Sequence, residues 1–581
     1  MFPIPTLIIL LFLAEHGLAS SDVRKNKQLT VVPADLVKTA KLIDLNDNKI
    51  PLVSDNDFAG FSSLGKVALG RNLITSVSEN AFQGSPVREL LLFGNLLQTI
   101  PNLINLRQSL LFLYLQDNNI MNLSMATAVD YNGLHTLNLG NNPLMSLPNM
   151  TTLQGTLKVL HLGSCKLHSI PDDYFLGFVA LQHLDLSRNL FVNLTAFTFQ
   201  GLQSLKVLDL QANRLLVSTD PATFSGLGQL QKLTMNDCDE LKNAPFLGDS
   251  SKLTHYQVTR GSFECLEHRV MENKSSLIWL DLSANDMHNF SVNSCEVEAA
   301  SRYQVPLDFP VLTDLTLAGN FLTFAPNVSL MPKLKKLYLH SNKLTTWPQD
   351  YLRNNKDLHT LSLSHNQFDV APVINEGCEH LLNLEMTNNR ISSLPSDYFK
   401  NCHKITFVNF QHNLLTSVSA FNGIGPSLQK LFLHRNHISA IQANDLANLT
   451  GLEDLSVQNN QMKFFNSSVL QNKPSLTMLD LSTNQLKSMG NMYNWCMPNV
   501  CKNLRLVLDA NPIICDEQLC WMDRYQGYIH VTLYGCVLSM INCPGVYFCH
   551  FHQTQSFYPC STKSFASLPC PPAVLIGLPS A

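Results

Sequence analysis

The stretch Leu181-Gln-His-Leu184-Asp-Leu186-Ser-Arg-Asn189 decides the fold, because the same phrase returns throughout the chain of 581 residues. It recurs as Leu205-Lys-Val-Leu208-Asp-Leu210-Gln-Ala-Asn213 and five further times with little change. Alignment on the final Asn gives twenty units, at positions 48, 72, 95, 118, 142, 165, 189, 213, 238, 261, 285, 320, 342, 366, 389, 413, 436, 460, 484 and 511. The steps are 22 to 25 residues, apart from 35 before Asn320 and 27 before Asn511. Such a period predicts a solenoid of stacked turns.

The residue pattern explains why each turn needs its neighbours. Leu184 and Leu186 are two positions apart, so both point to one face of a short strand. Stacked turns join these leucines into a continuous core, and each buried Leu contributes roughly 1.5–3 kcal/mol. The Asn closes the turn, where its amide can satisfy backbone groups of neighbouring turns. In phrases such as Phe175-Leu-Gly177, we expect the Phe to fill the outer side of the turn.

Over about residues 30 to 545 the chain resembles the extracellular, typical-class leucine-rich-repeat family. Within that family, its repeat number, 24-residue period and long insertion are most similar to Toll-like receptor ectodomains and chaoptin-like adhesion proteins. The resemblance implies an α/β fold: a right-handed leucine-rich-repeat solenoid, or horseshoe, of about twenty repeats. It further implies a parallel concave sheet and a disulfide-linked C-terminal cap.

The sequence divides into five expected segments. Residues 1–19 are typical of a signal peptide, and 20–40 resemble the family's N-terminal cap without its cysteines. The repeats occupy 41–513, with an irregular insertion at about 286–311, and a cysteine-rich C-terminal cap occupies 514–549. In the tail, 550–581, the only charged residue is Lys563. This tail is either an extension or a variant terminus that replaces a membrane anchor. No segment after residue 19 has the apolar length of a transmembrane helix, so we expect a secreted protein, membrane-anchored if the terminus is a variant or truncated end.

Fifteen cysteines favour an oxidising compartment. Cys165 and Cys238 occupy the Asn position of their units and are expected to be buried thiols. Cys265 and Cys295 flank the irregular stretch, and our hypothesis is that they pair and hold a projecting loop.

Cys378 and Cys402 occupy nearly equivalent places in adjacent turns, where they either form a bridge or remain two buried thiols. The resemblance implies a disulfide-linked C-terminal cap whose connectivity stays open. Its candidate cysteines are Cys515, Cys520, Cys536 and Cys543.

Glycosylation sequons are about as frequent as chance predicts, so they are candidates only. They begin at Asn122, Asn149, Asn193, Asn273, Asn289, Asn327, Asn448 and Asn466.

The composition and motifs favour binding over catalysis. A net charge of −4 argues against a generic nucleic-acid binder. The chain has no phosphate-binding, dinucleotide, zinc-protease or nucleophile-elbow motif and no C-x-x-C pair. We therefore expect no catalytic residue, no cofactor and no metal site.

Two groups of residues at the exposed positions of the strands are candidate partner-binding surfaces. Apolar side chains on units three and four form the first group: Leu91, Phe93, Phe112 and Tyr114. They either bind a partner or cover one another. Cationic and imidazole groups alternate with aromatic side chains in the second group: Lys335, Lys336, Tyr338, His340, His365, Phe407, His412, Lys430, Phe432, His434 and Arg435.

The second group suits an acidic or glycan-bearing partner, or is a solvated face that is basic by chance. If its histidines have ordinary pKa values, binding strengthens as the pH falls. The leading interpretation is an extracellular recognition protein for a protein or glycan ligand, similar to a Toll-like receptor ectodomain and possible as a dimer. The alternatives are an adhesion or matrix protein and, more remotely, an enzyme.

Overall fold

The computed structural model describes residues 21–121, 131, 133–248, 250–292, 306–488, 504–515, 529–532 and 537–538. The chain forms two compact units. The N-terminal unit comprises Met1–Leu344 with Tyr351–Lys356, and the C-terminal unit comprises Thr345–Asp350 with Asp357–Ala581. Each unit is described by itself.

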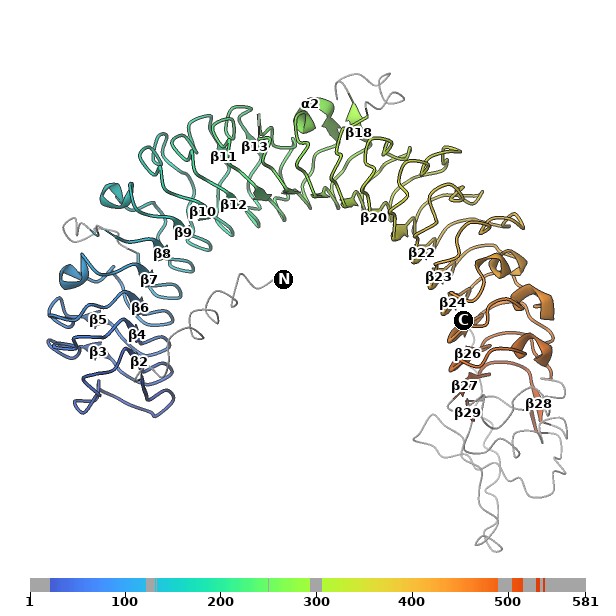
Figure 1. Ribbon diagram of the computed structural model, residues 1–581, viewed down its shortest axis with the longest axis horizontal. Helices are drawn as coiled ribbons and strands as arrows, with labels where there is room; N and C mark the ends of the chain where they lie inside the picture. Colours follow the sequence, from blue (N-terminus) through green and yellow to red (C-terminus); the bar gives the residue numbers. More distant parts are fainter. Residues whose placement is uncertain are drawn as a thin grey trace, which may run out of the picture. The chain divides into compact units, whose positions relative to one another are not determined.

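In the N-terminal unit, short parallel strands lie side by side along the inner edge of a curved stack, one for each predicted turn and β1 before the first of them (Figure 1). They are β1 (Ser21–Val23), β2 (Leu42–Asp44), β4 (Lys66–Ala68), β6 (Glu89–Leu91), β7 (Phe112–Tyr114), β8 (Thr136–Asn138), β9 (Val159–His161), β10 (His183–Asp185), β12 (Val207–Asp209), β14 (Lys232–Thr234), β15 (His255–Gln257), β17 (Trp279–Asp281), β19 (Asp314–Thr316) and β20 (Lys336–Tyr338). Smaller elements lie between them: β3 (Leu52–Val53), β5 (Ser76–Val77), η1 (Ile104–Leu106), η2 (Thr151–Leu153), β11 (Asn193–Leu194), β13 (Ser218–Thr219), β16 (Cys265–Glu267), α2 (His268–Met271) and β18 (Asn289–Val292).

The C-terminal unit repeats this arrangement. Its strands are β21 (Thr360–Ser362), β22 (Asn383–Glu385), β23 (Phe407–Asn409), β24 (Lys430–Phe432), β25 (Asp454–Ser456), β26 (Met478–Asp480), β27 (Leu504–Val507), β28 (Ile514–Cys515), β29 (Ile529–Thr532) and β30 (Val537–Leu538). Three 3-10 helices lie between strands: η4 (Ser419–Ile424), η5 (Ala443–Leu446) and η6 (Ser467–Leu470). Successive strands from β21 to β27 pair in parallel and without register shifts. The predicted parallel leucine-rich-repeat solenoid is confirmed.

The core follows the predicted pattern. Leu184 and Leu208 are paired across β10 and β12, and both are at most 1% exposed. On the outer side of the turns, Phe175, Phe199 and Phe224 form a stack with ring centroids 6.4 and 5.6 Å apart. In these turns the strand leucines and the stacked phenylalanines therefore fill the two sides of the core.

The repeated Asn links each turn to its neighbours. The amide nitrogen of Asn413 donates to the carbonyls of Phe410 in its own turn, at 3.1 Å, and Met386 in the preceding turn, at 2.8 Å. Its side-chain oxygen accepts the N–H of Ile391 at 3.1 Å. One side chain thus satisfies backbone groups that the stacked leucines keep away from water.

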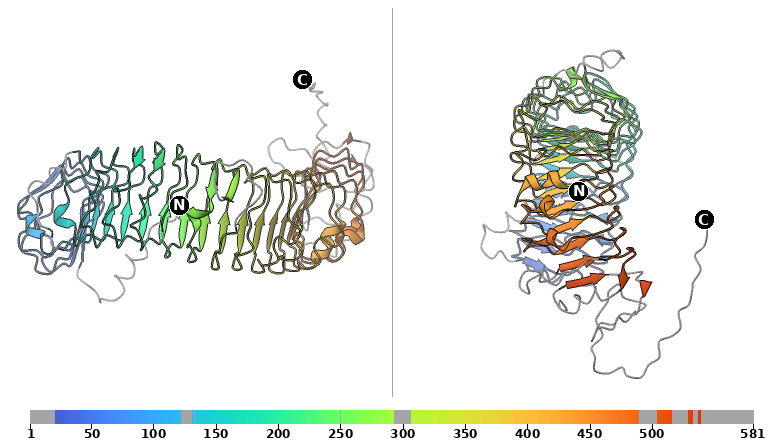
Figure 2. Two further views of the ribbon diagram at one scale, coloured as in Figure 1. Left: turned by 90° about the horizontal axis from the view of Figure 1, so that it is seen from above. Right: turned by 90° about the vertical axis from the view of Figure 1, so that its right-hand side faces the viewer.

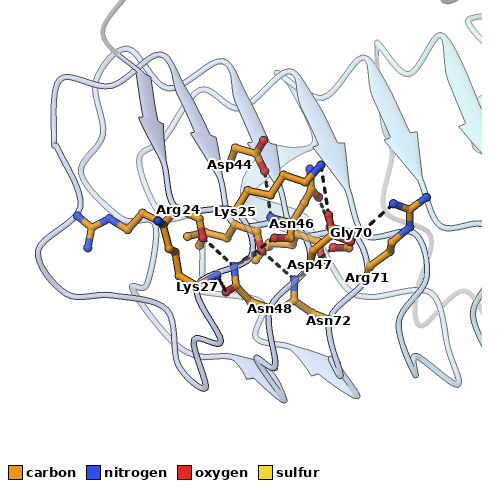
Figure 3. Close-up of polar contacts among 12 residues, drawn as sticks. Arg24, Lys25, Lys27, Asp44, Asn46, Asp47, Asn48, Gly70, Arg71 and Asn72 are labelled. Carbon is orange, nitrogen blue, oxygen red and sulfur yellow. Dashed lines mark hydrogen bonds and ion pairs between the residues drawn. The ribbon is translucent and has the colours of Figure 1, made fainter.

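The N-terminal cap has no cysteine and is held by polar contacts (Figure 3). Asn48 binds the cap through its oxygen, which accepts the N–H groups of Lys27 and Leu29 at 2.9 and 3.0 Å. The Arg24 guanidinium lies 2.9 Å from the Asp22 carboxylate and 2.6 Å from that of Asp35. These contacts join residues 22–35 to one another and to the first repeat.

The cysteines within the repeats are either free thiols or disulfide-bonded. Cys165 and Cys238 are buried free thiols, as predicted, and burial raises the pKa of each to about 12. Cys378 and Cys402 form a disulfide between adjacent turns, with an S–S distance of 2.01 Å. Cys265 is disulfide-bonded, and its pairing with Cys295 stays a prediction because Cys295 lies outside the described residues.

The irregular stretch begins as a small lateral element. β16 and β18 pair in parallel beside α2, and residues 293–305 of the predicted insertion lie outside the described residues. The same holds for Cys520, Cys536 and Cys543 of the predicted C-terminal cap. Among the described residues, no helix has the length and apolar character needed to cross a bilayer.

Candidate ligand-binding surface

In each unit the strands of the sheet lie side by side (Figure 2). Side chains at alternating strand positions lie opposite the core, on the open face of the sheet. Because the strands pair in register, equivalent positions of successive turns lie side by side. Binding residues on this face are therefore far apart in the sequence and adjacent in space. All the predicted partner-binding residues lie in or directly beside these rows.

The first predicted group is less exposed than its apolar character suggested. Leu91, Phe93, Phe112 and Tyr114 are all half-buried. The Phe93 ring lies over Gly70, where a Cβ would meet it at 2.5 Å, and the Arg71 guanidinium lies 5.6 Å from the ring centroid. The group thus packs partly against its own neighbours, and binding of a partner there stays a prediction.

The second predicted group is divided between the two units. Its members in the N-terminal unit are Lys335, Lys336, Tyr338 and His340. Lys336 is exposed and lies 2.8 Å from Asp314, whose hydrogen bond raises the pKa of the lysine. The Tyr338 and His340 rings meet edge to face, 6.1 Å apart. Here the positive charge is already balanced by a carboxylate.

The members in the C-terminal unit form a compact surface of their own: His365, Phe407, His412, Lys430, Phe432, His434 and Arg435. Phe407 on β23 and Phe432 on β24 pack edge to face with centroids 5.6 Å apart, and both are half-buried. Lys430 is exposed beside them, in register with Phe407. The pair of rings makes an apolar platform.

Beside this platform lies a cluster of imidazoles and a guanidinium. Arg435 Nη1 is 3.1 Å from His412 Nε2, and the His412 and His434 rings are 6.2 Å apart. Burial and then the Arg435 charge lower the pKa of His412. The pKa of His434 is lowered as well, first by burial and then by the charges of His412 and Arg435. Burial is the main cause for both residues, and the charge of Arg435 adds to it, so these two histidines do not have the ordinary pKa values on which the expected pH dependence was conditional.

Sequence reasoning missed a second polar cluster, in the N-terminal unit. Asp185 and Asp209 are in register on β10 and β12, and His161 Nδ1 lies 3.4 Å from Asp185. Burial raises the pKa of Asp209 to about 6. Burial opposes ionisation of Asp185 as well, but hydrogen bonds from His161 and Ser187 lower its pKa. The signal was available, since all three residues occupy the same strand position in successive units.

A ladder of left-handed residues, also missed, borders the open face. In most turns the residue before the Asn has a positive φ, as at Asp47 (59°), Arg260 (54°) and Arg435 (55°). Side chains of adjacent ladder positions contact one another, for example Arg260 and Asp237 at 2.5 Å. The backbone thus directs a second line of polar groups toward the face that carries the candidate sites.

Among the residues that the structure describes, no group of three or more His, Cys, Asp or Glu side chains has an arrangement that could hold a metal ion. Seven sequons lie within the described part. Asn149, Asn193, Asn273 and Asn448 are exposed. Asn289, Asn327 and Asn466 are half-buried, and Asn122 lies outside. Glycosylation at these sites stays a prediction.

Comparison with known proteins agrees with this geometry. The family model described as "Leucine rich repeat" matches residues 155–215, 186–239 and 426–486. Over these residues the chain contains leucine-rich repeats. It is 31% identical to human "Leucine-rich repeats and immunoglobulin-like domains protein 3" over 31% of its own length and 16% of that protein. It is 29% identical to chicken Tsukushi over 37% of its length and 60% of that protein. The chain thus matches less than two thirds of either relative.

Among solved structures, the fold resembles that of Toll in its complex with Spatzle from Drosophila. The TM-score is 0.58 at 19% identity, and the match covers 86% of this leucine-rich-repeat chain and 62% of the other. At that identity the likeness concerns the fold alone.

Proposed function

We propose that this leucine-rich-repeat protein is an extracellular recognition protein that binds a protein ligand through the open face of its C-terminal unit. The observation that carries the proposal is the apolar platform of Phe407 and Phe432 beside Arg435 and exposed Lys430. Partly buried aromatic anchors next to cationic groups are typical of protein-binding surfaces. The surface binds without catalysis, because its side chains include no nucleophile with an adjacent general base.

Two further facts support the proposal, one for binding of a protein and one for secretion. The Toll structure that shares the fold is a complex with another protein. The chain also carries an apolar run in residues 5–14 that is typical of an export signal. We propose secretion on that basis, and a fractionation of expressing cells into medium and membranes tests it.

The experiment is a dose–response measurement against an array of purified extracellular protein domains. We expect saturable binding to a small set of them, weakened at least tenfold by Arg435→Glu. Arg390→Glu is the matched control, because Arg390 is exposed but lies outside the platform. Lys336→Glu tests the corresponding group of the N-terminal unit separately.

Two results would contradict the proposal. If Arg435→Glu binds as tightly as wild type, this surface does not take part in the interaction. Clustering of protein-coated beads without saturable binding to any single domain would instead favour an adhesion or matrix role.

A further inference from the structure

Arg435 is unusual among the arginines of the left-handed ladder. Arg71 and Arg260 each face an aspartate one turn earlier, Asp47 at 3.6 Å and Asp237 at 2.5 Å. Arg435 faces His412 instead, with Nη1 3.1 Å from Nε2. Across the described part of the chain, no carboxylate forms an ion pair with Arg435. Among the described arginines of the ladder, which also include Arg188, Arg435 is therefore the one whose side chain is hydrogen-bonded to a base and not to an acid.

This hydrogen bond fixes the state of His412. A guanidinium only donates, so Nε2 of His412 accepts with its lone pair, and the ring is neutral with its proton on Nδ1. Protonation of His412 would replace the hydrogen bond by repulsion between two cations. His434, 6.2 Å away, has a buried Nδ1 that makes no hydrogen bond within the described structure.

The other groups around His412 do not supply a counter-charge. On the next turn toward the N-terminus, Asn388 donates to His365 at 3.2 Å, and His365 lies near enough to oppose a charge on His412. On the other side, Asp480 acts on His434 from two turns away. The cluster therefore has one guanidinium and two imidazoles that can take up a proton, but, among the described residues, no carboxylate of its own beside His412.

We propose that His412, His434 and Arg435 form a proton-coupled site for a carboxylate carried by a protein ligand. The inference rests on the proposed function and deepens it. The incoming carboxylate accepts a hydrogen bond from Arg435 in place of Nε2 of His412. His412 then takes one proton from solution at Nε2 and donates it in a second hydrogen bond to the same carboxylate. The one covalent bond formed is the N–H bond at Nε2 of His412, and its proton comes from solution, so one proton is taken up for each carboxylate bound.

The surroundings favour a single carboxylate beside an apolar side chain over a sulfated glycan. Phe432 ends β24, and His434 follows two residues later on the other side of buried Leu433, so the aromatic platform adjoins the cationic cluster. Asp454 lies in register with Lys430, one strand further along. It would repel a chain with sulfates at short intervals, whereas an acidic side chain next to an aromatic one fits the platform and the cluster together.

Isothermal titration calorimetry of the full chain tests the proposal with a defined probe, the peptide acetyl-Phe-Asp-Phe-amide, and its Asn twin. Titrations in two buffers with different heats of ionisation count the protons taken up. We expect the Asp peptide to bind up to about tenfold more tightly at pH 5.5 than at pH 7.5, since one pKa unit corresponds to a factor of ten. The Asn peptide should bind at least tenfold more weakly and take up no proton.

Variants separate the two roles. His412→Gln keeps an acceptor for Arg435 and a donor for the ligand but cannot titrate, so binding of the Asp peptide should persist without proton uptake or pH dependence. Arg435→Gln should abolish the preference for Asp over Asn, whereas Arg390→Gln should change nothing. The proposal fails if the two peptides bind equally, if His412→Gln still takes up a proton, or if a heparin fragment outcompetes the Asp peptide.

The outcome also distinguishes this inference from the function on which it rests. Binding of an extracellular protein that depends on Arg435 but involves no proton uptake would overturn only the proton-coupled site. Proton-coupled binding of the Asp peptide, with no extracellular protein bound, would overturn the proposed function and leave the carboxylate site standing.

Discussion

The backbone N–H of Cys165 donates to the side-chain oxygen of Asn189 in the next turn, at a distance of 3.1 Å. Cys165 occupies the position at which most turns have an Asn, and Asn189 of the next turn accepts its backbone N–H. The Cys165 thiol donates to the Leu139 carbonyl at 3.3 Å but offers no amide oxygen to the turn before it. There, the N–H of Leu144 binds the carbonyl of Asn142 in its own turn at 2.9 Å. One link between turns is therefore missing.

We predict that Cys165→Asn restores this link and raises the free energy of unfolding by about 1 kcal/mol, the usual net value of one hydrogen bond. Urea unfolding, followed by tryptophan fluorescence and far-ultraviolet circular dichroism of the N-terminal unit, measures the change. Asn189→Ala is the converse test, because it leaves several buried backbone groups unsatisfied and should cost 2 kcal/mol or more by the order of magnitude of such losses. A destabilised Cys165→Asn protein would mean that the site is too small for an amide.

Thr483 is a β-branched residue at a left-handed ladder position, with φ +53°, whereas Asn459 occupies the equivalent position at +52°. A β-branched side chain is strained in this conformation, and Asn tolerates it better. We predict that Thr483→Asn raises the free energy of unfolding by about 1 kcal/mol. Thr346 is exposed and has no positive φ, so Thr346→Asn serves as the control. Equal effects of the two changes would contradict a backbone cause.

The repeat could be predicted from the sequence almost residue by residue because its signal is local. Leu184 and Asn189 carry their roles in a phrase of nine residues, and each aligned Asn or its replacement follows a strand in the structure. The partner-binding surface was only partly predictable. Position in the repeat places Phe407 and Phe432 on the open face, but their packing and the Arg435–His412 hydrogen bond depend on side-chain directions across turns. Spacing alone contains neither.

The cysteine-free N-terminal cap depends on Arg24. Asp22 is only 7% exposed and accepts the Val37 N–H at 3.1 Å. The hydrogen bond from Arg24 lowers the pKa of Asp22. We predict that Arg24→Gln leaves this carboxylate without its cation and increases hydrogen exchange of the Lys49 amide, which binds Leu29 of the cap. The free energy of opening measured by exchange of this amide should fall by about 1–2 kcal/mol, the usual cost of losing a partly buried hydrogen bond to a charged group. Lys27→Gln is the control, since the Lys27 side chain is exposed and only its backbone contacts Asn48.

The disulfide between Cys378 and Cys402 encloses a chain segment with a sequence separation of 24. Closing a loop of that size restricts the unfolded chain by about 3 kcal/mol in the chain-entropy treatment. We therefore predict that the double change Cys378→Ala and Cys402→Ala lowers the free energy of unfolding of the C-terminal unit by about that amount. Wild type unfolded in the presence of dithiothreitol should approach the variant. If reduction leaves the wild-type midpoint unchanged while the variant is destabilised, the loss comes from packing and not from the cross-link.

Asp209 makes the stability of the N-terminal unit depend on pH in an unusual direction. Burial raises its pKa from 3.8 to about 6, with neighbouring Asp185 acting in the same sense. The folded protein thus holds this proton to a higher pH than the unfolded chain does. The contribution of Asp209 to stability therefore falls as the pH rises from about 4 to about 6, and stays low above that. Asp209→Asn keeps an oxygen for the Gln211 N–H, which lies 3.0 Å from Oδ1, and removes the buried charge.

We therefore predict that Asp209→Asn is more stable than wild type at pH 7.5 by on the order of 2 kcal/mol, and that the difference disappears near pH 4. Urea unfolding at a series of pH values measures the difference, which cancels the titration of all other groups. Asp397→Asn is the control, because Asp397 is exposed. A gain that persists unchanged at pH 4 would show that the substitution acts through packing, since a protonated Asp209 carries no charge to remove.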